Sequence, residues 1–276
     1  MNENQTVSVI IPTYNRADYI GKAIQSVLDQ TWKNFEIIVV DDGSEDNTEQ
    51  VVGHFTDSRI RYIRSDKNQG PCSARNIGIK EALSDYIAFL DSDACWNNDK
   101  LEKQMDKMAV CDQDVALVYC RVQSVGKNQE VEKIWPPCDI ELDAALRGNM
   151  FRLLLLRNMI DTSTMLVRTS CLREIGGFEE TLTATEDWEL ALRISEKWKI
   201  EFVEDILVDT YTTSDHRVSL DVPGHIKARC HMVEKYWKRM VEEEMFDDIV
   251  KDLLMIAHHY NLYEETKAFL RECIKE

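Results

Sequence analysis

Short apolar runs alternate with segments of helical spacing along the N-terminal part of the chain. Continuous β-branched runs such as Val7–Ile11 and Phe35–Val40 are typical of strands buried on both faces of a parallel sheet. Two more strands are predicted at Arg59–Arg64, nearer the sheet edge, and at Tyr86–Leu90. The intervening segments predict helices at Ala17–Gln30, Asp46–Phe55 and Ser73–Leu83. This alternation implies βαβ units with right-handed crossovers, and therefore an α/β fold with a mixed, mainly parallel sheet flanked by helices.

The second half of the chain has a less regular pattern. Gly126–Asp143, which contains two consecutive prolines, is predicted to be a loop. Strands are predicted at Val115–Val125, Thr162–Val167 and Ile200–Val208, and helices at Asp99–Val110 and Glu186–Trp198. From about residue 223 the pattern is helical, at His225–Glu243, Asp247–Tyr260 and Glu264–Lys275. We therefore expect a main domain over residues 1–220 and a helical subdomain over residues 221–276.

The predicted strands of the first half end in polar residues. Pro12-Thr13-Tyr14-Asn15 follows the first strand, Asp41-Asp42-Gly43-Ser44 the second, and Asp91-Ser92-Asp93 the fourth. Ligands bind beyond the carboxyl ends of parallel strands, so these residues are expected to border one cleft. Two acids at positions i and i+2 of an extended segment point the same way. They can bind Mg²⁺ or Mn²⁺ together with waters and substrate phosphates, although an acid pair in a loop is more often simply solvated.

Each remaining side chain of this cleft has a functional and a structural interpretation. Asp42 could accept hydrogen bonds from a base or ribose, or only solvate the turn before a helix. Tyr14 could stack on a planar ring or be an ordinary exposed loop tyrosine. Arg75 lies one turn into a helix that opens with Gly70-Pro71, so it could reach a phosphate or pair with the acids of the fourth strand end. These alternatives stay open on the sequence alone.

A further acidic pair, Glu186-Asp187, lies between Thr185 and Trp188. Thr185 is suited to cap the predicted helix, and acids are favoured in a first helical turn. Local helix chemistry therefore explains both acids without assigning them to a reaction.

Charge and composition exclude several kinds of partner. The 276 residues include 33 Lys and Arg against 50 Asp and Glu, a net charge of −17. That charge argues against binding to DNA or RNA and against simple electrostatic docking on anionic lipid. The eight cysteines form no CxxC pair, which indicates reduced thiols of a cytosolic protein. With no evident signal peptide and no apolar run of about 18 residues, we expect a cytoplasmic protein, at most peripheral on the inner face of a membrane.

Five segments, taken in order, resemble family 2 of the inverting glycosyltransferases with the GT-A fold, in the nucleotide-diphospho-sugar transferase superfamily. They read SVIIPTYNR, FEIIVVDDGSEDNT, GPCSARNIG, YIAFLDSD, and REIGGFEE followed by TEDWELALRI. The resemblance runs from about Val7 to Ile194. It implies that residues 1–220 form a Rossmann-like GT-A catalytic domain that binds a nucleotide sugar, followed by a C-terminal helical extension.

The resemblance implies donor-binding roles for six residues, namely Pro12, Tyr14, Asp42, Arg75, Asp91 and Asp93. The ring of Tyr14 would stack on uracil or another base, in a pocket with Pro12, and Asp42 would hydrogen-bond that base. Asp91 would bind the ribose, and Asp93 would bind a Mn²⁺ or Mg²⁺ ion shared with the diphosphate. Arg75 would fix the acids or the diphosphate itself.

The resemblance places the reaction itself at the TEDW segment. Asp187 would be the general base that takes a proton from an acceptor hydroxyl, with Glu186 and Trp188 beside it in the acceptor region. One base and direct displacement at C1 of the donor, a UDP-sugar, imply inversion. The ordinary low pKa of an aspartate is tolerable because the proton moves late. The loop Gly176–Phe178 would lie under the donor sugar.

The nature of the acceptor and the end of the domain are less well defined. The expected acceptor is a sugar, a lipid-linked molecule or a protein, in the synthesis of a cell-surface polysaccharide or glycoconjugate. Members of the family often carry an arginine–histidine element after the last strand, and Tyr211–Leu220 matches it only loosely. His216 is a candidate second metal ligand there, or an exposed loop histidine. The helical tail lies outside the resemblance and could pair subunits in a homodimer, touch a membrane or shape the acceptor site.

Two other functions fit parts of the pattern. A phosphatase of the haloacid-dehalogenase type also has an Asp-x-Asp motif after an apolar strand, but that strand normally opens the core, whereas here it is the fourth. A non-catalytic module that binds a nucleotide would explain the strand-end acids but would not require Asp187. We therefore expect a glycosyltransferase of the hexosyltransferase type.

Overall fold

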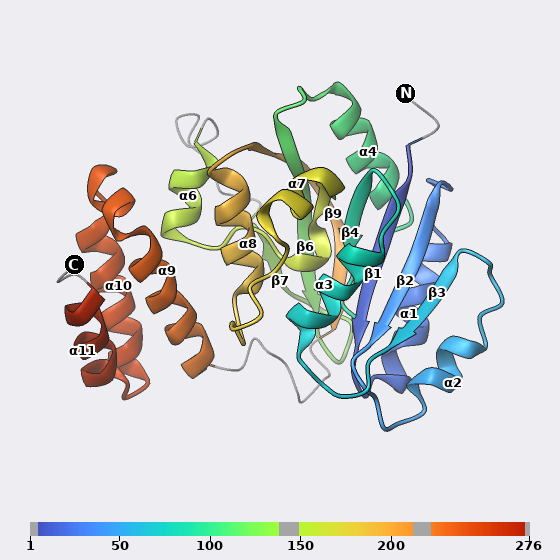
Figure 1. Cartoon of the computed structure of the whole chain (residues 1–276), viewed down its shortest axis with the longest axis horizontal. Helices are drawn as coiled ribbons and strands as arrows, with labels where there is room; N and C mark the ends of the chain where they lie inside the picture. Colours follow the sequence, from blue (N-terminus) through green and yellow to red (C-terminus); the bar gives the residue numbers. More distant parts are fainter. Residues whose placement is uncertain (1–4, 138–148, 212–221, 274–276) are drawn as a thin grey trace.

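The computed structural model describes residues 5–137, 149–211 and 222–273, and its centre is one mixed sheet (Figure 1). The strands are β1 Val7–Thr13, β2 Phe35–Asp41, β3 Ile60–Arg64, β4 Tyr86–Phe89, β5 Ala94–Trp96, β6 Val115–Val125, β7 Val131–Trp135, β8 Leu166–Arg168 and β9 Lys199–Tyr211. They lie in the order β3-β2-β1-β4-β8-β6-β9-β5, and β7 pairs with β6. The pairs among β1, β2, β3 and β4 are parallel, as is β6 with β9, while β8 and β5 pair antiparallel with their neighbours. The predicted mixed, mainly parallel sheet is confirmed.

Helices cover both faces of the sheet. They are α1 Ala17–Leu28, α2 Thr48–Gly53, α3 Pro71–Glu81, α4 Lys100–Val110, α6 Met150–Leu156, α7 Thr169–Ile175, α8 Glu186–Ser195, α9 Val222–Glu242, α10 Phe246–His259 and α11 Tyr263–Cys273, with a 3-10 turn η1 at Thr162–Thr164. Every helix predicted from periodicity is present, with ends that differ by a few residues.

The alternation of side chains along each strand explains why the strand runs are apolar throughout. On β1, Val9 and Ile11 face a hydrophobic cluster that includes residues of α1 and α4, whereas Ile10 faces a second cluster with α3 and α8. Helix α3 approaches β1 closely because residue 78 is a glycine. A Cβ atom on Gly78 would lie 2.5 Å from Cγ2 of Ile10. Burial on both faces therefore holds the strand ends, and the residues that follow them, in fixed positions.

Five short elements depart from the sequence-based prediction. Within the segment predicted as a loop, Val131–Trp135 forms strand β7, whose mostly exposed residues lack an apolar pattern. Thr162–Thr164 is a 3-10 turn rather than the start of a strand, because the Asp161 side chain accepts the N–H of Ser163 at 2.8 Å. Strand β5 and helices α6 and α7 were not predicted, since three to seven residues are too few to show a period.

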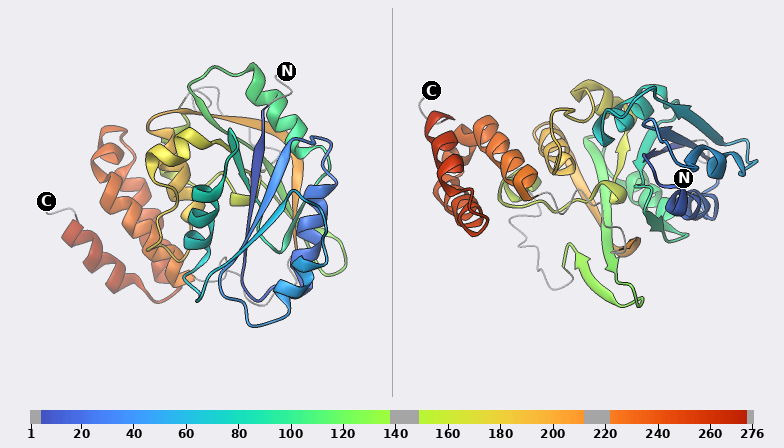
Figure 2. Two further views of the ribbon diagram at one scale, coloured as in Figure 1. Left: turned by 45° about the vertical axis from the view of Figure 1, so that its right-hand side comes forward. Right: turned by 90° about the horizontal axis from the view of Figure 1, so that it is seen from below.

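The C-terminal helices pack on one end of the main body, next to α6 and α8 (Figures 1 and 2). The rings of Phe151 on α6 and Tyr236 on α9 lie 5.8 Å apart, and Nζ of Lys235 donates to Oε1 of Glu189 on α8 at 2.8 Å. The tail also belongs to the same hydrophobic cluster as the α3 face of the sheet. The expected boundary at residue 220 lies outside the described residues, so the division into two units remains a prediction. None of the described helices is long and apolar enough to cross a lipid bilayer.

Candidate active site

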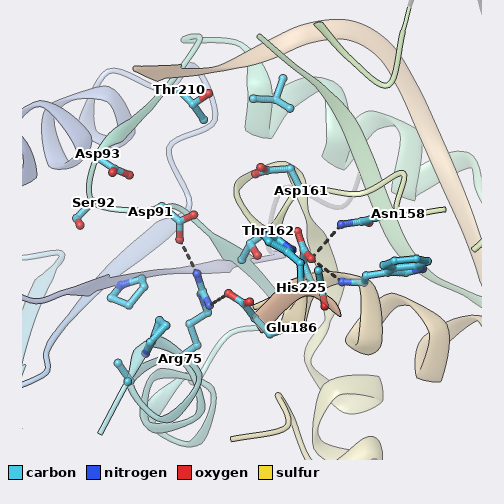
Figure 3. Close-up of a pocket in the computed structure, with 18 of the residues that line it drawn as sticks. Arg75, Asp91, Ser92, Asp93, Asn158, Asp161, Thr162, Glu186, Thr210 and His225 are labelled. Carbon is cyan, nitrogen blue, oxygen red and sulfur yellow. Dashed lines mark hydrogen bonds and ion pairs between the residues drawn. The ribbon is translucent and has the colours of Figure 1, made fainter. Parts of the chain in front are cut away.

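A cleft of about 1170 Å³ opens beyond the carboxyl ends of β1, β2 and β4 (Figure 3). Nine residues singled out from the sequence line it together: Pro12, Tyr14, Asp42, Arg75, Asp91, Asp93, Glu186, Asp187 and Trp188. The tenth, His216, lies outside the described residues. Residues from the two halves of the chain thus meet in one cavity, as expected for the ends of parallel strands.

Arg75 joins the acids of the strand end to those of α8. It is only 4% exposed, and its Nη2 donates to Oδ1 of Asp91 at 2.7 Å and its Nη1 to Oε1 of Glu186 at 2.8 Å. Its Cζ lies 5.3 Å from the centre of the Phe178 ring. Burial disfavours the cation, but the two carboxylates outweigh burial and raise the pKa of Arg75. Arg75 therefore fixes the acids of the cleft, which is one of the two roles expected for it.

Asp42 is held by the loop that precedes α3. Its Oδ2 accepts hydrogen bonds from the backbone N–H groups of Gln69 at 2.9 Å and Gly70 at 2.7 Å. Gly43 forms the turn beside it with a φ of 82°, where a side chain would be strained. The other oxygen, Oδ1, is buried and has no hydrogen-bond partner among the described residues. Because an unpaired buried carboxylate oxygen is costly, this atom is suited to accept a hydrogen bond from a ligand in the cleft.

Asp91 and Asp93 lie at the rim of the cleft, on either side of Ser92 (Figure 3). The backbone N–H of Asp91 donates to Oγ of Ser163 at 3.1 Å, which anchors the chain just past β4. Among the described residues, no group of three or more His, Cys, Asp or Glu side chains could hold a metal ion by itself. Carboxylate oxygens at this rim fit Mg²⁺ or Mn²⁺ in the manner usual for nucleotide sites, where phosphates and waters complete the coordination.

Asp187 lies in the first turn of α8 and is half-buried in the cleft. Its Oδ1 accepts hydrogen bonds from Nδ2 of Asn158 at 3.0 Å and from the N–H of Trp188 at 2.6 Å. Burial first, and then the charges of Glu186 and Asp161, raise the pKa of Asp187 well above that of an ordinary aspartate. The expectation of a low pKa is therefore corrected. A raised pKa makes this carboxylate a stronger proton acceptor once it is ionised.

Asp161 is a cleft residue that the sequence analysis missed. It lies just before η1, and Figure 3 shows it in the cavity with Asn158. Burial and the charge of Asp91 raise the pKa of Asp161 to about 7. The signal available in the sequence was an Asp followed by Thr-Ser-Thr, which is typical of a capped turn rather than of a strand.

Further parts of the lining come from the C-terminal helices and from β7. The residues concerned are Val222, His225, Ile226 and Arg229 on α9, Ile256 on α10, Tyr260 just after α10, and Lys133 and Trp135 on β7. Cζ of Arg229 lies 5.4 Å from the centre of the Trp188 ring, so α9 meets the cleft next to the TEDW segment. No motif marks these residues, and their place in the cleft depends on how the tail packs.

The loop Gly176–Phe178 lies beneath the cleft. Nδ2 of Asn76 donates to the carbonyl oxygen of Phe178 at 2.9 Å, and its Oδ1 accepts the N–H of Phe178 at 2.8 Å. A Cβ atom on Gly177 would lie 2.4 Å from Oδ1 of Asn76, which explains the glycine. None of the three loop residues is among those that line the cleft. The loop thus contacts Arg75 through Phe178, and its place under the donor sugar stays a prediction.

Comparison with known sequences identifies relatives of the chain. The family described as Glycosyl transferase family 2 matches residues 8–176. An uncharacterised glycosyltransferase of Rickettsia conorii is 34% identical over 244 residues, which make up 87% of this chain and 39% of that protein. WfgD of Escherichia coli, a UDP-Glc:alpha-D-GlcNAc-diphosphoundecaprenol beta-1,3-glucosyltransferase, is 37% identical over 146 residues, 53% of this chain and 57% of WfgD. The matches thus span less than two thirds of the length of either relative.

Solved structures share the fold. TarS 1–349 of S. aureus in complex with UDP-GlcNAc matches with a TM-score of 0.66 at 18% identity, over 98% of this chain and 89% of TarS. The mannosyltransferase PcManGT from Pyrobaculum calidifontis, in complex with GDP-Man and Mn²⁺, matches with a TM-score of 0.65 at 17% identity, over 99% and 76%. The predicted GT-A fold is thereby confirmed. Since the family match also covers most of the strands and motifs from which the cleft is built, the chain belongs to glycosyl transferase family 2.

Proposed function

We propose that this glycosyltransferase is a metal-dependent, inverting enzyme that moves a sugar from a UDP-sugar to an acceptor hydroxyl, in the synthesis of a cell-surface polysaccharide or glycoconjugate. The observation that carries the proposal is that Asp93 and Asp187 line one cleft, in which Arg75 links the acids of both sides. Uridine as the base is supported by the UDP-GlcNAc in the TarS complex and by the UDP-glucose named for WfgD.

The nucleotide is assigned to the part of the cleft beyond β1 and β2. The unpaired Oδ1 of Asp42 would accept a hydrogen bond from the N–H of uracil. Tyr14, whose side chain is 40% exposed, offers a ring face for stacking on the base, with Pro12 beside it in the same lining. Asp91, already oriented by Arg75, would bind the ribose.

Asp93 is assigned to the divalent cation. The donor diphosphate is negatively charged, and it would approach a rim that carries two carboxylates, so the acids alone would repel it. A Mn²⁺ or Mg²⁺ ion bound there would offset this repulsion and neutralise the charge that develops on the leaving diphosphate. The Mn²⁺ in the PcManGT complex supports this choice of ion. The assignment of His216 as a further ligand stays a prediction.

Asp187 is assigned the role of general base. The acceptor hydroxyl oxygen attacks C1 of the donor sugar from the face opposite the diphosphate, and the new O–C1 bond forms as the bond from C1 to the diphosphate oxygen breaks. The electron pair of the broken bond leaves with UDP, and the hydroxyl proton passes to the carboxylate of Asp187. Asn158 holds that carboxylate in place. A single displacement of this kind inverts the configuration at C1.

A melting-temperature screen of UDP- and GDP-sugars, with and without Mn²⁺, tests the donor and the metal together. A ligand that binds only the folded protein raises its stability, so we expect the largest increase for a UDP-sugar with Mn²⁺. Asp93→Ala should remove the metal-dependent part of the increase, whereas Asp106→Ala, on the exposed side of α4, should not. An unchanged increase in Asp93→Ala would refute the metal assignment. Binding without turnover of any donor would favour a nucleotide-binding module instead.

A further inference from the structure

The C-terminal helices close the end of the cleft at which the acceptor must enter. In the proposed reaction the acceptor hydroxyl has to reach Asp187. Arg229 of α9 lies over the ring of the next residue, Trp188, and both line the cleft. Figure 3 shows His225 of α9 in the same cavity, with Glu186 and Asn158. The surface presented by α9 and α10 is therefore the first part of the protein that an acceptor would meet beside the base.

This end of the cleft has an apolar wall. Its apolar members are Val222, Ile226, Ile256 and Tyr260. Ile256 lies in the last turn of α10, and Tyr260 directly follows that helix. Tyr260 is 48% exposed, so the apolar wall reaches the surface of the protein. At the donor end the lining combines Pro12 and Tyr14 with a set of polar residues, namely Asp42, Asn68, Asp91, Ser92 and Asp93.

A cationic side chain accompanies the apolar wall. Arg229 lines this end of the cleft, beside His225, in a chain whose net charge is −17. Nη2 of Arg229 donates to Oδ2 of Asp252 at 3.0 Å, and the side chains are 20% and 46% exposed. An exposed pair of this kind orients the guanidinium without burying it. The planar fork of arginine is suited to the oxygens of a phosphate group.

We infer that α9 and α10 form an acceptor subsite for a sugar that is joined through phosphate to a hydrocarbon chain. The inference rests on the proposed function, because it takes Asp187 as the base. An acceptor with these three parts matches three surfaces: its sugar hydroxyl at Asp187, its phosphate at Arg229, and its hydrocarbon along Ile256 and Tyr260. A free oligosaccharide has no hydrocarbon part to contact the apolar wall, and a hydrocarbon without phosphate has no anionic group to bind Arg229.

The test measures binding of farnesyl diphosphate by isothermal titration calorimetry, in the presence of saturating UDP and Mn²⁺ so that the donor site is occupied. Inorganic pyrophosphate and farnesol are titrated in parallel as the anionic part and the apolar part alone. We expect farnesyl diphosphate to bind at least about tenfold more tightly than either part, since each contributes its own contacts. Equal affinities for pyrophosphate and farnesyl diphosphate would overturn the hydrocarbon assignment. Equal affinities for farnesol and farnesyl diphosphate would overturn the phosphate assignment.

Variants then locate the subsite. Arg229→Gln should weaken the binding of farnesyl diphosphate by about tenfold, because a charge-assisted contact is lost, and should leave farnesol unaffected. Tyr260→Ser should weaken farnesyl diphosphate and farnesol alike. Lys227→Gln, which removes a charge from an exposed position of α9 outside the cleft lining, is the matched control and should change neither. Loss of affinity in Lys227→Gln equal to that in Arg229→Gln would refute the subsite.

Melting temperatures measured with UDP and Mn²⁺ distinguish a failure of this inference from a failure of the proposed function. The shift in melting temperature with UDP and Mn²⁺ reports the donor site, and every variant should retain it if it is folded. Retained UDP binding with no farnesyl diphosphate binding refutes the acceptor class alone. Absence of any UDP or metal effect in the unmodified protein refutes the proposed function instead.

Discussion

The proposed donor and acceptor halves of the cleft are built in different ways. In the donor half, side chains at strand ends are held by direct hydrogen bonds, as Asp42 is by two backbone N–H groups and Asp91 is by Arg75. In the acceptor half, helices α9 and α10 present side chains whose positions depend on apolar packing of the tail. The donor half is therefore ordered locally, whereas the acceptor half can change with the packing of three helices.

The acids of the cleft also differ, in whether a neighbouring cation offsets their charge. Arg75 offsets the charge of Asp91 and Glu186 through two short ion pairs. Within the described residues, Asp161 and Asp187 form no such ion pair, and burial and neighbouring acids raise the pKa of each. Carboxyl groups whose environments give them different pKa values can take different chemical roles. Asp91 is thus suited to bind the donor, and Asp187 is suited to exchange a proton.

The largest expected effect is the loss of kcat in a variant of Asp187. Asp187→Asn keeps a side-chain oxygen for Asn158 but cannot accept a proton. We expect kcat to fall about 10²–10⁴-fold, the usual contribution of a general base, with UDP and Mn²⁺ binding unchanged. Steady-state kinetics with the donor found in the screen, beside calorimetry with UDP, measures both. A loss of UDP affinity as large as the loss of kcat would indicate that Asp187 binds the donor.

A large loss of stability is expected when the link between the two sets of acids is removed. Arg75→Leu leaves Glu186 and Asp91, whose side chains are 10% and 36% exposed, without their cation. Breaking a buried pair costs about 3–5 kcal/mol, and the partial exposure of Asp91 places this case near the lower end. The quantity to measure is the free energy of unfolding in urea.

Arg61→Leu is the matched control for that experiment. Arg61 also bridges two acids, Glu36 and Glu81, at 3.3 and 3.0 Å, but its side chain is 39% exposed. Exposed pairs contribute about 0–1 kcal/mol, so its loss should be small. Similar losses in both variants would mean that the burial of Arg75 has no special importance.

The smallest expected effect is a gain in thermal stability in a variant of Asp161, and its size should depend on pH. The pKa of its carboxyl group is raised from 3.8 to about 7 in the folded protein, so the folded state holds a proton that the unfolded chain releases between those values. Folding is therefore penalised increasingly as pH rises through that interval. Asp161→Asn, which can still accept the N–H of Ser163, should raise the melting temperature by a few degrees more at pH 8 than at pH 5.

Asp57→Asn provides a control of opposite sign. The pKa of Asp57 is lowered to about 2 by hydrogen bonds from Arg59, so the stability that it contributes is lost only as pH falls below about 4. The variant should be less stable than the unmodified protein by the same amount at pH 5 and pH 8. If Asp161→Asn also changed the melting temperature equally at pH 5 and pH 8, the surroundings of the Asp161 carboxyl would not disfavour its charged form.

Local sequence patterns predicted the donor half well. Strands β1, β2 and β4 are recognisable because every residue of an apolar run is buried in a sheet covered on both faces. The polar residues that follow them can only lie at the sheet edge, so Asp42, Asp91 and Asp93 were expected in one cleft. Strand β7 was missed because it is largely exposed and has no apolar period.

The chain by itself thus determined the family, the parallel strands and the acids at their ends, since each depends on residues close together in sequence. Only the tertiary structure decided that Arg75 bridges Asp91 to Glu186, 111 residues beyond Arg75, and that Asp161 shares the cavity of Asp187. It also decided that Arg229 and Tyr260 of the tail belong to that cavity. The physical reason is that such contacts are selected by the packing of whole helices against the sheet, which no local period or motif records.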